Sequence, residues 1–295
     1  MKYLIIFVLC QVFILKVTAQ DFKRPYARQH NYLVELLQDQ VNSESKSMAL
    51  EPSSVAIETS YYDGLGRLIQ KVSRKSSFGS LDLVSQVGYD KKGRIKKQYL
   101  PYSHGTDGNF KRYAINNNGY TNSDQFLFYQ NADDHTSDEK PYSETIYEAS
   151  PLNRPLKQGA PGSAWQPDPD ANITTDNVIH YSYEVSTLTD NVYIWDIDLI
   201  TADLTATGHY PNGQLTKTMT TDEAGHAVIE FVDKLGQTIL KRVQAVEAPN
   251  MTTYTAGDWA DTYYVYDDFG NLRYVLPPEA VKEISSPSFP YTPSP

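Results

Sequence analysis

A short peptide of fixed turn chemistry recurs along this chain and constrains its fold more than any other feature. The fullest copies are Tyr62-Asp63-Gly64-Leu65-Gly66-Arg67-Leu68, Tyr89-Asp90-Lys91-Lys92-Gly93-Arg94-Ile95 and Tyr266-Asp267-Asp268-Phe269-Gly270-Asn271-Leu272. Weaker copies keep only Asp-x-x-Gly, at Asp222 to Gly225 and at Asp233 to Gly236. The segment from Glu148 to Arg154 is an enlarged relative, and Tyr210-Pro211-Asn212-Gly213 lacks the aspartate. Self-similarity of this kind indicates a repeated supersecondary unit.

Each position of the peptide suits a β-hairpin. The aspartate accepts a hydrogen bond from an amide two residues further on. The glycine supplies the positive φ of a type I turn followed by a bulge. The tyrosine ends the incoming strand with an apolar ring and a polar tip. The candidate site residues are therefore structural: Tyr62, Asp63, Gly66, Arg67, Tyr89, Asp90, Gly93, Arg94, Asp222, Gly225, Asp233, Gly236, Tyr266, Asp267 and Gly270.

The segments between these turns have the composition of strands. Ten runs are rich in Val, Ile, Tyr and Thr: VAIETSYY, RLIQKVSR, LVSQVGY, RIKKQYL, VIHYSYEV, QLTKTMTT, HAVIEFV, QTILKRV, DTYYVY and NLRYVL. Such residues favour a pleated, half-buried surface. Short strands with frequent turn signals predict a mainly β fold of repeated antiparallel hairpins.

Two insertions interrupt the predicted repeat region, which we place at 54–280. The insertion at about 103–140 is polar and rich in Asn and Gly, and its aromatic cluster from Phe126 to Tyr129 predicts one short helix. The insertion at about 159–177 is rich in proline, and we expect a surface loop. Residues 20–53 form a lead segment in which Asn31 to Val41 has helical spacing, with a strand as the alternative. Residues 281–295 read as a Pro/Ser-rich linker or a truncated end.

The first 19 residues have the layout of a secretory signal peptide. A basic start precedes an apolar run at 3–17, and small residues end at Ala19. The run is short for a membrane span and is interrupted by Gln11 and Lys16, which favours cleavage over a retained anchor. The single cysteine, Cys10, leaves with this segment, so the mature chain has no disulfide. We expect a protein that is secreted or held at the cell surface, with no membrane span after cleavage.

Composition narrows the possible partners. The chain has 295 residues and a formal net charge of −10, which argues against nucleic acid, because phosphate binding needs a cationic face. Tyrosine is in surplus, with 23 residues against 10 phenylalanines. Many of these tyrosines stand beside the Asp-x-x-Gly turns or within the strand runs, so the surplus reflects the repeat.

These Tyr-Asp-x-x-Gly-Arg hairpins resemble the Rhs/YD-repeat family. The segments YYDGLGRLIQ, QYLPY, YEASPLNRPLKQGAPGSAWQ and YYVYDDFGNLRYVLPPEA are similar to the N-terminal region of secreted bacterial Rhs-repeat proteins, an uncharacterised domain before the repeat array. The resemblance covers roughly Tyr61 to Ala280. It implies a twisted or spiral sheet strip that builds a shell around a C-terminal effector or displays binding modules. The copies here are irregularly spaced, and no self-cleaving core motif or toxin domain follows them, so toxin activity is not carried over.

Residues with catalytic or ligand-binding chemistry form no recognisable motif. The six histidines, at 30, 104, 135, 180, 209 and 226, are scattered, whereas zinc needs clustered ligands. The acidic stretch from Asp168 to Asp176 has Ile173 and Ile179 where a calcium loop of the EF-hand type needs Gly and Glu. Lys91, Lys92, Lys96 and Lys97 form a basic patch that we interpret as a solvated strand face. We expect no catalytic residues, no cofactor and no metal.

The leading hypothesis is an exported, non-enzymatic structural module, the front part of a repeat shell. Its partners would be the continuation of its own repeat array or a C-terminal effector domain. The alternative is a cell-surface module that binds carbohydrate or protein, with Trp165 and exposed tyrosines as stacking surfaces for a surface glycan. A secreted hydrolase is a third alternative, which no catalytic constellation supports.

Overall fold

The computed structural model describes residues 31–38, 55–130, 136–170, 175–198, 200–201 and 204–284, with backbone only for 31–38. The predicted signal peptide lies outside these residues, as do most of the lead segment and the Pro/Ser-rich end. The chain forms two compact units. Unit 1 comprises Met1–Ile146 and Gln158–Asp168, and unit 2 comprises Tyr147–Lys157 and Pro169–Pro295.

The prediction of a mainly β, antiparallel fold is confirmed. The strands are β1 (Asn31–Gln38), β2 (Val55–Tyr62), β3 (Leu68–Ser73), β4 (Leu83–Tyr89), β5 (Ile95–Ser103), β6 (Tyr142–Tyr147), β7 (Pro155–Gly159), β8 (Ile179–Val185), β9 (Tyr193–Ile197), β10 (Leu204–His209), β11 (Thr216–Thr221), β12 (Ala227–Val232), β13 (Thr238–Gln244), β14 (Trp259–Tyr266) and β15 (Leu272–Leu276). All ten runs predicted as strands overlap one of these elements. The helices are α2 (Asp124–Gln130) and α3 (Pro278–Ile284).

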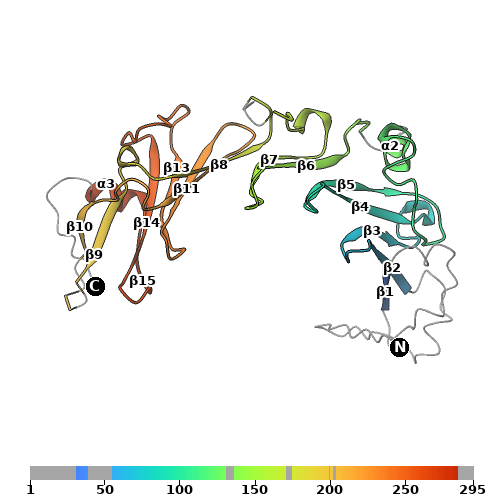
Figure 1. The fold of residues 1–295 in the computed structure, drawn as a ribbon, viewed down its shortest axis with the longest axis horizontal. Coiled ribbons are helices and arrows are strands. Elements are labelled where there is room, and N and C mark those ends of the chain that lie inside the picture. Colours follow the sequence, from blue (N-terminus) through green and yellow to red (C-terminus); the bar gives the residue numbers. More distant parts are fainter. Residues whose placement is uncertain are drawn as a thin grey trace. The chain divides into compact units, whose positions relative to one another are not determined.

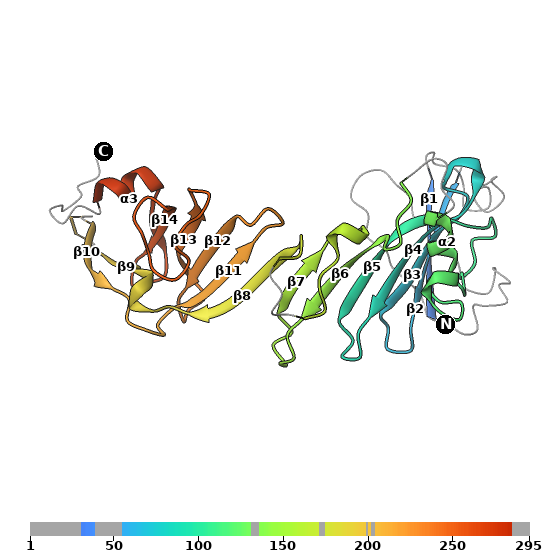
Figure 2. The same ribbon diagram turned by 90° about the horizontal axis from the view of Figure 1, so that it is seen from above.

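Unit 1 is an antiparallel sheet in which β1 to β6 lie in sequence order (Figures 1 and 2). Its buried face carries Tyr61, Val72, Val84 and Tyr102. The insertion between β5 and β6 covers this face, with Phe110 and the aromatic residues of α2 packed against the cluster. The prediction of a short helix in this insertion is therefore confirmed.

The expectation of a helix at Asn31 to Val41 is wrong. Residues Asn31–Gln38 form β1, which pairs with β2 from Asn31↔Tyr62 to Gln38↔Val55. A short apolar run fits either element by its spacing alone. An isolated helix this short is only marginally stable in water, whereas a strand at this place gains the ladder of hydrogen bonds to β2.

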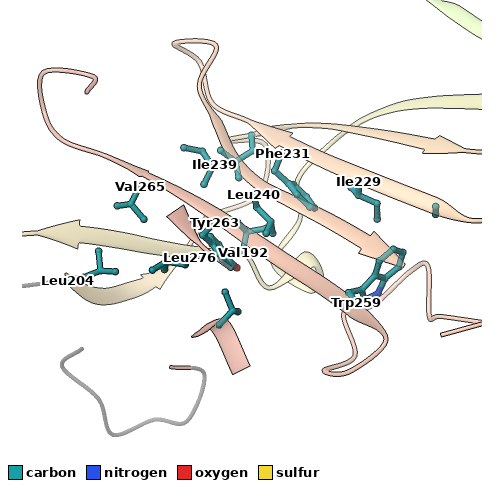
Figure 3. Packing of buried hydrophobic residues seen from close by; sticks show 13 residues of the cluster. Val192, Leu204, Ile229, Phe231, Ile239, Leu240, Trp259, Tyr263, Val265 and Leu276 are labelled. Atoms are coloured by element: carbon teal, nitrogen blue, oxygen red, sulfur yellow. The ribbon is translucent and has the colours of Figure 1, made fainter. Parts of the chain in front are cut away.

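In unit 2, strands lie in the order β8-β11-β12-β13-β14-β15 and pair antiparallel. One face is covered by the separate β9–β10 ribbon and by α3, which contribute Leu204 and Val281 to the core. Figure 3 shows Phe231, Leu240 and Tyr263 among the buried side chains of this core. Strand β14 shows the pattern most clearly, since its residues alternate between buried and half-buried along its whole length.

The helix α3 was not predicted. It begins at Pro278, after Pro277, and the absence of a proline amide donor is harmless in the first turn of a helix. Val281 is buried against β14, so the helix caps the core of unit 2. The segment that the sequence assigned to a linker therefore begins with helical residues up to Ile284.

Candidate functional site: the repeated hairpin turns

The first turn shows how the repeat closes a hairpin. Asp63 N donates to the carbonyl of Arg67 at 2.9 Å, and Gly66 N donates to the carbonyl of Asp63 at 3.1 Å. The Asp63 carboxylate oxygen Oδ1 accepts the amides of Leu65 and Arg67, both at 2.9 Å. Gly66 has φ 79°, in the left-handed region that glycine occupies without strain. The register between β2 and β3 shifts at Tyr61/Tyr62, as a bulged turn requires.

Four further turns have the same geometry. In each, the aspartate accepts the amide four residues on, and the glycine has a φ between 80° and 89°. The distances from that amide to Oδ1 are 2.9 Å at Asp90, 2.8 Å at Asp222, 2.8 Å at Asp233 and 2.9 Å at Asp267. The weaker copies, at Asp222 and Asp233, therefore form the same turn as the complete ones. The repeat is defined by Asp and Gly, and the tyrosine and arginine are additions to it.

The enlarged turn from Glu148 to Arg154 reproduces the same closure with other residues. Glu148 N donates to the carbonyl of Arg154 at 3.0 Å. The Glu148 carboxylate accepts the amide of Arg154 at 3.2 Å and binds its guanidinium through two nitrogens. Asn153, with φ 58°, takes the left-handed position of the glycine. By contrast, Gly213 has φ 74° but donates its amide to Ser186, so the segment around it is not a copy of the turn.

Several turn carboxylates are held in their charged form, namely Asp63, Asp90, Asp222, Asp267 and Glu148. The amide of Arg67 lowers the pKa of Asp63, and the guanidinium of Arg154 lowers the pKa of Glu148 to about 2. Burial alone would raise the pKa of Asp267, but the amides of Asn271 and Phe269, the Asn271 side chain and the Arg273 guanidinium together lower it to about 2. Hydrogen bonds and positive charge both stabilise the ionised form, so these turns are strongest above the usual carboxyl pKa.

The residue after the turn glycine links one hairpin to the next. The Arg67 guanidinium lies 4.5 Å from the centroid of the Tyr89 ring, and the Tyr89 hydroxyl donates to the carbonyl of Leu68 at 2.8 Å. At the enlarged turn, Arg154 lies 4.3 Å from the centroid of the Tyr183 ring on β8.

Gln237 makes the corresponding link in unit 2, where its side chain donates to the carbonyl of Gly270 at 3.4 Å. In three of the six closed turns, therefore, the residue directly after the left-handed position contacts a later strand or turn. In each case the contact runs from one turn to a residue that comes later in the sequence.

The other candidate residues have local roles. Arg94 pairs with Asp90 of its own turn at 2.7 Å, and His226 replaces an arginine beside Asp222 at 3.2 Å. Tyr62 is half-buried next to its turn, and Tyr266 packs against the core of unit 2. The candidate residues lie at the turns that join successive strands within each unit.

Two buried polar networks were missed by the sequence reasoning. In unit 1, the Lys111 ammonium lies 2.8 Å from Asp82, which is fully buried, and 2.5 Å from Asp107. Gln70 donates to Gln86 and accepts the amide of Lys111, so this network fastens the insertion to the sheet. Sequence offers no signal for it, because residues 70, 82 and 111 meet only through the fold.

The network in unit 2 centres on Arg242. Its guanidinium binds both oxygens of Asp261, at 2.8 and 3.0 Å, and donates to the carbonyl of Asp190 at 3.0 Å. It also lies 4.2 Å from the centroid of the Tyr254 ring. Arg242 and Asp261 are both nearly inaccessible to solvent, which fits a structural role for the pair.

The histidines and the acidic stretch from Asp168 to Asp176 were the other candidate ligand sites in the sequence. Among the described residues, no group of three or more His, Cys, Asp or Glu side chains could hold a metal ion. His30 and His135 lie outside the described residues, as does the centre of the acidic stretch, 171–174. At the edge of that stretch, the Lys157 ammonium binds Asp176 at 3.0 Å.

The basic patch and Trp165 can be placed directly. Lys96 and Lys97 both pair with Glu144 on β6, at 3.2 and 3.3 Å. Trp165 ends a 3-10 helix, Ser163–Trp165, and 43% of its surface is exposed. The Asp138 carboxylate accepts the amide of Ser163 and so holds this loop.

Comparison with known proteins gives one match. Residues 35–179, just under half of the chain, match the family model described as Domain of unknown function (DUF6443). The match begins within β1 and ends at the first residue of β8. No curated protein matches the chain. No helix in the described part of the chain is long and apolar enough to cross a membrane.

Proposed function

We propose that this chain is an exported, non-enzymatic structural module that forms the front part of an Rhs/YD-type repeat shell. Such a shell would encapsulate or display a C-terminal effector. The observation that carries the proposal is the single turn geometry built five times, with Asp and Gly in equivalent places. The recurring residues of this chain close hairpin turns, and repeated hairpins assemble into an antiparallel sheet.

The contacts between hairpins support the same role. Arg67 reaches Tyr89, and Gln237 reaches Gly270, so these two hairpins each contact the one that follows. An array that is stabilised by nearest neighbours can be extended by adding further copies of its unit. The described charged clusters also serve packing: Lys111 and Arg242 each fasten one chain segment to another.

The coding sequence beyond Pro295 tests the proposal. We expect further Tyr-Asp-x-x-Gly-Arg copies in frame, followed by a domain of different composition. A stop codon directly after Pro295, or a continuation without such copies, would contradict the role as the front of a shell.

One observation favours the alternative of a surface binding module. Trp165 presents 43% of its surface on a loop held by Asp138, and exposed aromatic rings can stack on the apolar faces of sugars. A glycan array with the wild type and with Trp165→Ala tests this. Binding that disappears in the variant supports the alternative, and binding to no glycan removes it.

A further inference from the structure

Two neighbouring hairpin tips of unit 2 expose large apolar side chains that the fold does not use. Leu235 and Phe269 occupy the same turn position, directly before the glycine, and each is 82% exposed. The two tips are adjacent, because Gln237 of the first turn donates to the carbonyl of Gly270 in the second. We call Lys234, Leu235, Asp268 and Phe269 the tip pair.

Turn closure does not require these apolar residues. The same position holds Lys92 in the turn that begins at Asp90, and Ala224 in the turn that begins at Asp222. Both turns close with the geometry of the others. An exposed leucine beside an exposed phenylalanine therefore calls for another explanation, and contiguous exposed apolar surface is typical of interaction sites.

The charges beside the two apolar residues differ in sign. Lys234 precedes Leu235, and Asp268 precedes Phe269, and both charged residues are exposed. The Lys234 ammonium donates to the neutral Gln214 side chain at 2.9 Å, so its charge is not neutralised there. Asp268 makes no ion pair with any residue that the structure describes. The tip pair thus carries one positive and one negative side chain, each beside an exposed apolar residue of its own turn.

We propose that the tip pair is a self-association surface, whose partner is the tip pair of a second copy of this chain. A two-fold axis between two such surfaces brings each patch against its own copy in the opposite direction. Leu235 of one copy then meets Phe269 of the other, and Lys234 of one copy meets Asp268 of the other. The surface is self-complementary in its apolar residues and in its charges, although the whole chain has a formal net charge of −10.

Unit 1 supplies a natural control. Leu65 has the same turn position and is 80% exposed, but the next tip carries Lys91 and Lys92. In the same two-fold arrangement Leu65 would meet the charged Lys92 of the other copy, and no acidic residue of either tip would balance the lysines, so Leu65 should not take part. The proposal goes beyond the role as a shell module, and its failure would leave the turn geometry and that role untouched.

Sedimentation velocity on the exported chain, from about 5 to about 200 μM, tests the proposal. The contact is small, so we expect a reversible dimer with a Kd on the order of tens of micromolar. Leu235→Ser and Phe269→Ser should each raise this Kd at least about tenfold. Leu65→Ser should leave it unchanged. All three side chains are exposed, and unaltered melting curves will show that the variants fold.

A charge exchange tests the two-fold geometry. Lys234→Asp and Asp268→Lys should each weaken the dimer, since each places like charges together across the axis. The double variant Lys234→Asp/Asp268→Lys should restore it. A chain that stays monomeric at 200 μM, a dimer insensitive to Leu235→Ser and Phe269→Ser, or a double variant no better than the single ones would each overturn the proposal.

Discussion

Within each turn, aspartate and glycine perform separate tasks. The glycine adopts a left-handed conformation at φ 79° to 89° in the five equivalent turns. The aspartate side chain satisfies two amides that the turn would otherwise leave to solvent. Both tasks are local, since donor and acceptor lie within four residues of each other. Side-chain identity at these two positions therefore determines the conformation of the loop.

Gly66 provides the clearest test of the backbone argument. No atom lies within 4 Å of the place where a Cβ would stand, so any penalty comes from the positive φ alone. We expect Gly66→Val to destabilise the fold by about 1–2 kcal/mol, because a β-branched residue resists this conformation. Gly64→Val is the matched control, since Gly64 lies in the same turn without a positive φ and is also uncrowded. Equal urea midpoints for the two variants would contradict the turn assignment.

The charged turns predict a dependence of stability on pH. A carboxyl group whose pKa is lower in the folded state stabilises the fold above its unfolded pKa, and this stabilisation is lost as the pH falls through the folded pKa. Asp267 and Glu148 have folded pKa values of about 2. The melting temperature should therefore fall between about pH 5 and pH 2.

Asp267→Asn separates this effect from general acid denaturation. The variant should be less stable than the wild type at pH 7 and close to it at pH 2, so its loss on acidification is smaller. Glu223→Gln removes an exposed carboxylate that accepts no amide of its turn, and its melting temperature should fall as steeply as that of the wild type. If Asp267→Asn and the wild type lose equal stability, the turn carboxylate has no such role.

At the scale of the elements, hairpins are coupled by the residue that follows the glycine. Arg67 covers the ring of Tyr89, whose hydroxyl returns a hydrogen bond to the first hairpin. A cation over an aromatic ring contributes about 0.5–1 kcal/mol at an exposed site. In the last described turn, Asn271, which follows the glycine, instead donates its side-chain amide to Asp267 of the same turn.

A double-mutant cycle measures this coupling. Arg67→Ala and Tyr89→Leu should together cost about 0.5–1 kcal/mol less than the sum of the single variants. The matched cycle of Arg273→Ala with Tyr89→Leu should be additive, since Arg273 belongs to the other unit. Additivity in both cycles, measured by urea unfolding, would show that neighbouring hairpins do not communicate through Arg67.

Elements that carry their own signal could be predicted, and those that depend on distant partners could not. The ten strand runs lie beside turns whose chemistry is local, and all ten are present. The helix α2 follows from its aromatic cluster. By contrast, β1 depends on pairing with β2, and β9 and β10 form a separate ribbon in a stretch of the chain that carries no closed copy of the turn. The buried pairs Lys111–Asp82 and Arg242–Asp261 join residues 29 and 19 positions apart, so no short sequence motif predicts them.

At the scale of the whole molecule, the chain consists of two units, each with its own core. Copies of the turn occur in both units, so the same local chemistry supports two separate cores. The match to the family model, residues 35–179, covers the described part of unit 1 from Glu35 onward and stops at the first residue of β8 in unit 2. Our central proposal is that the chain is the exported front of a longer array of hairpins.

Peptide mapping of the protein recovered from the culture fluid and the cell surface of its source tests this claim most directly. The account predicts a mature N-terminus at Gln20, and peptides beyond Pro295 that contain further Tyr-Asp-x-x-Gly sequences. A protein that retains Met1 inside the cell, or one that is exported and ends at Pro295, would contradict it.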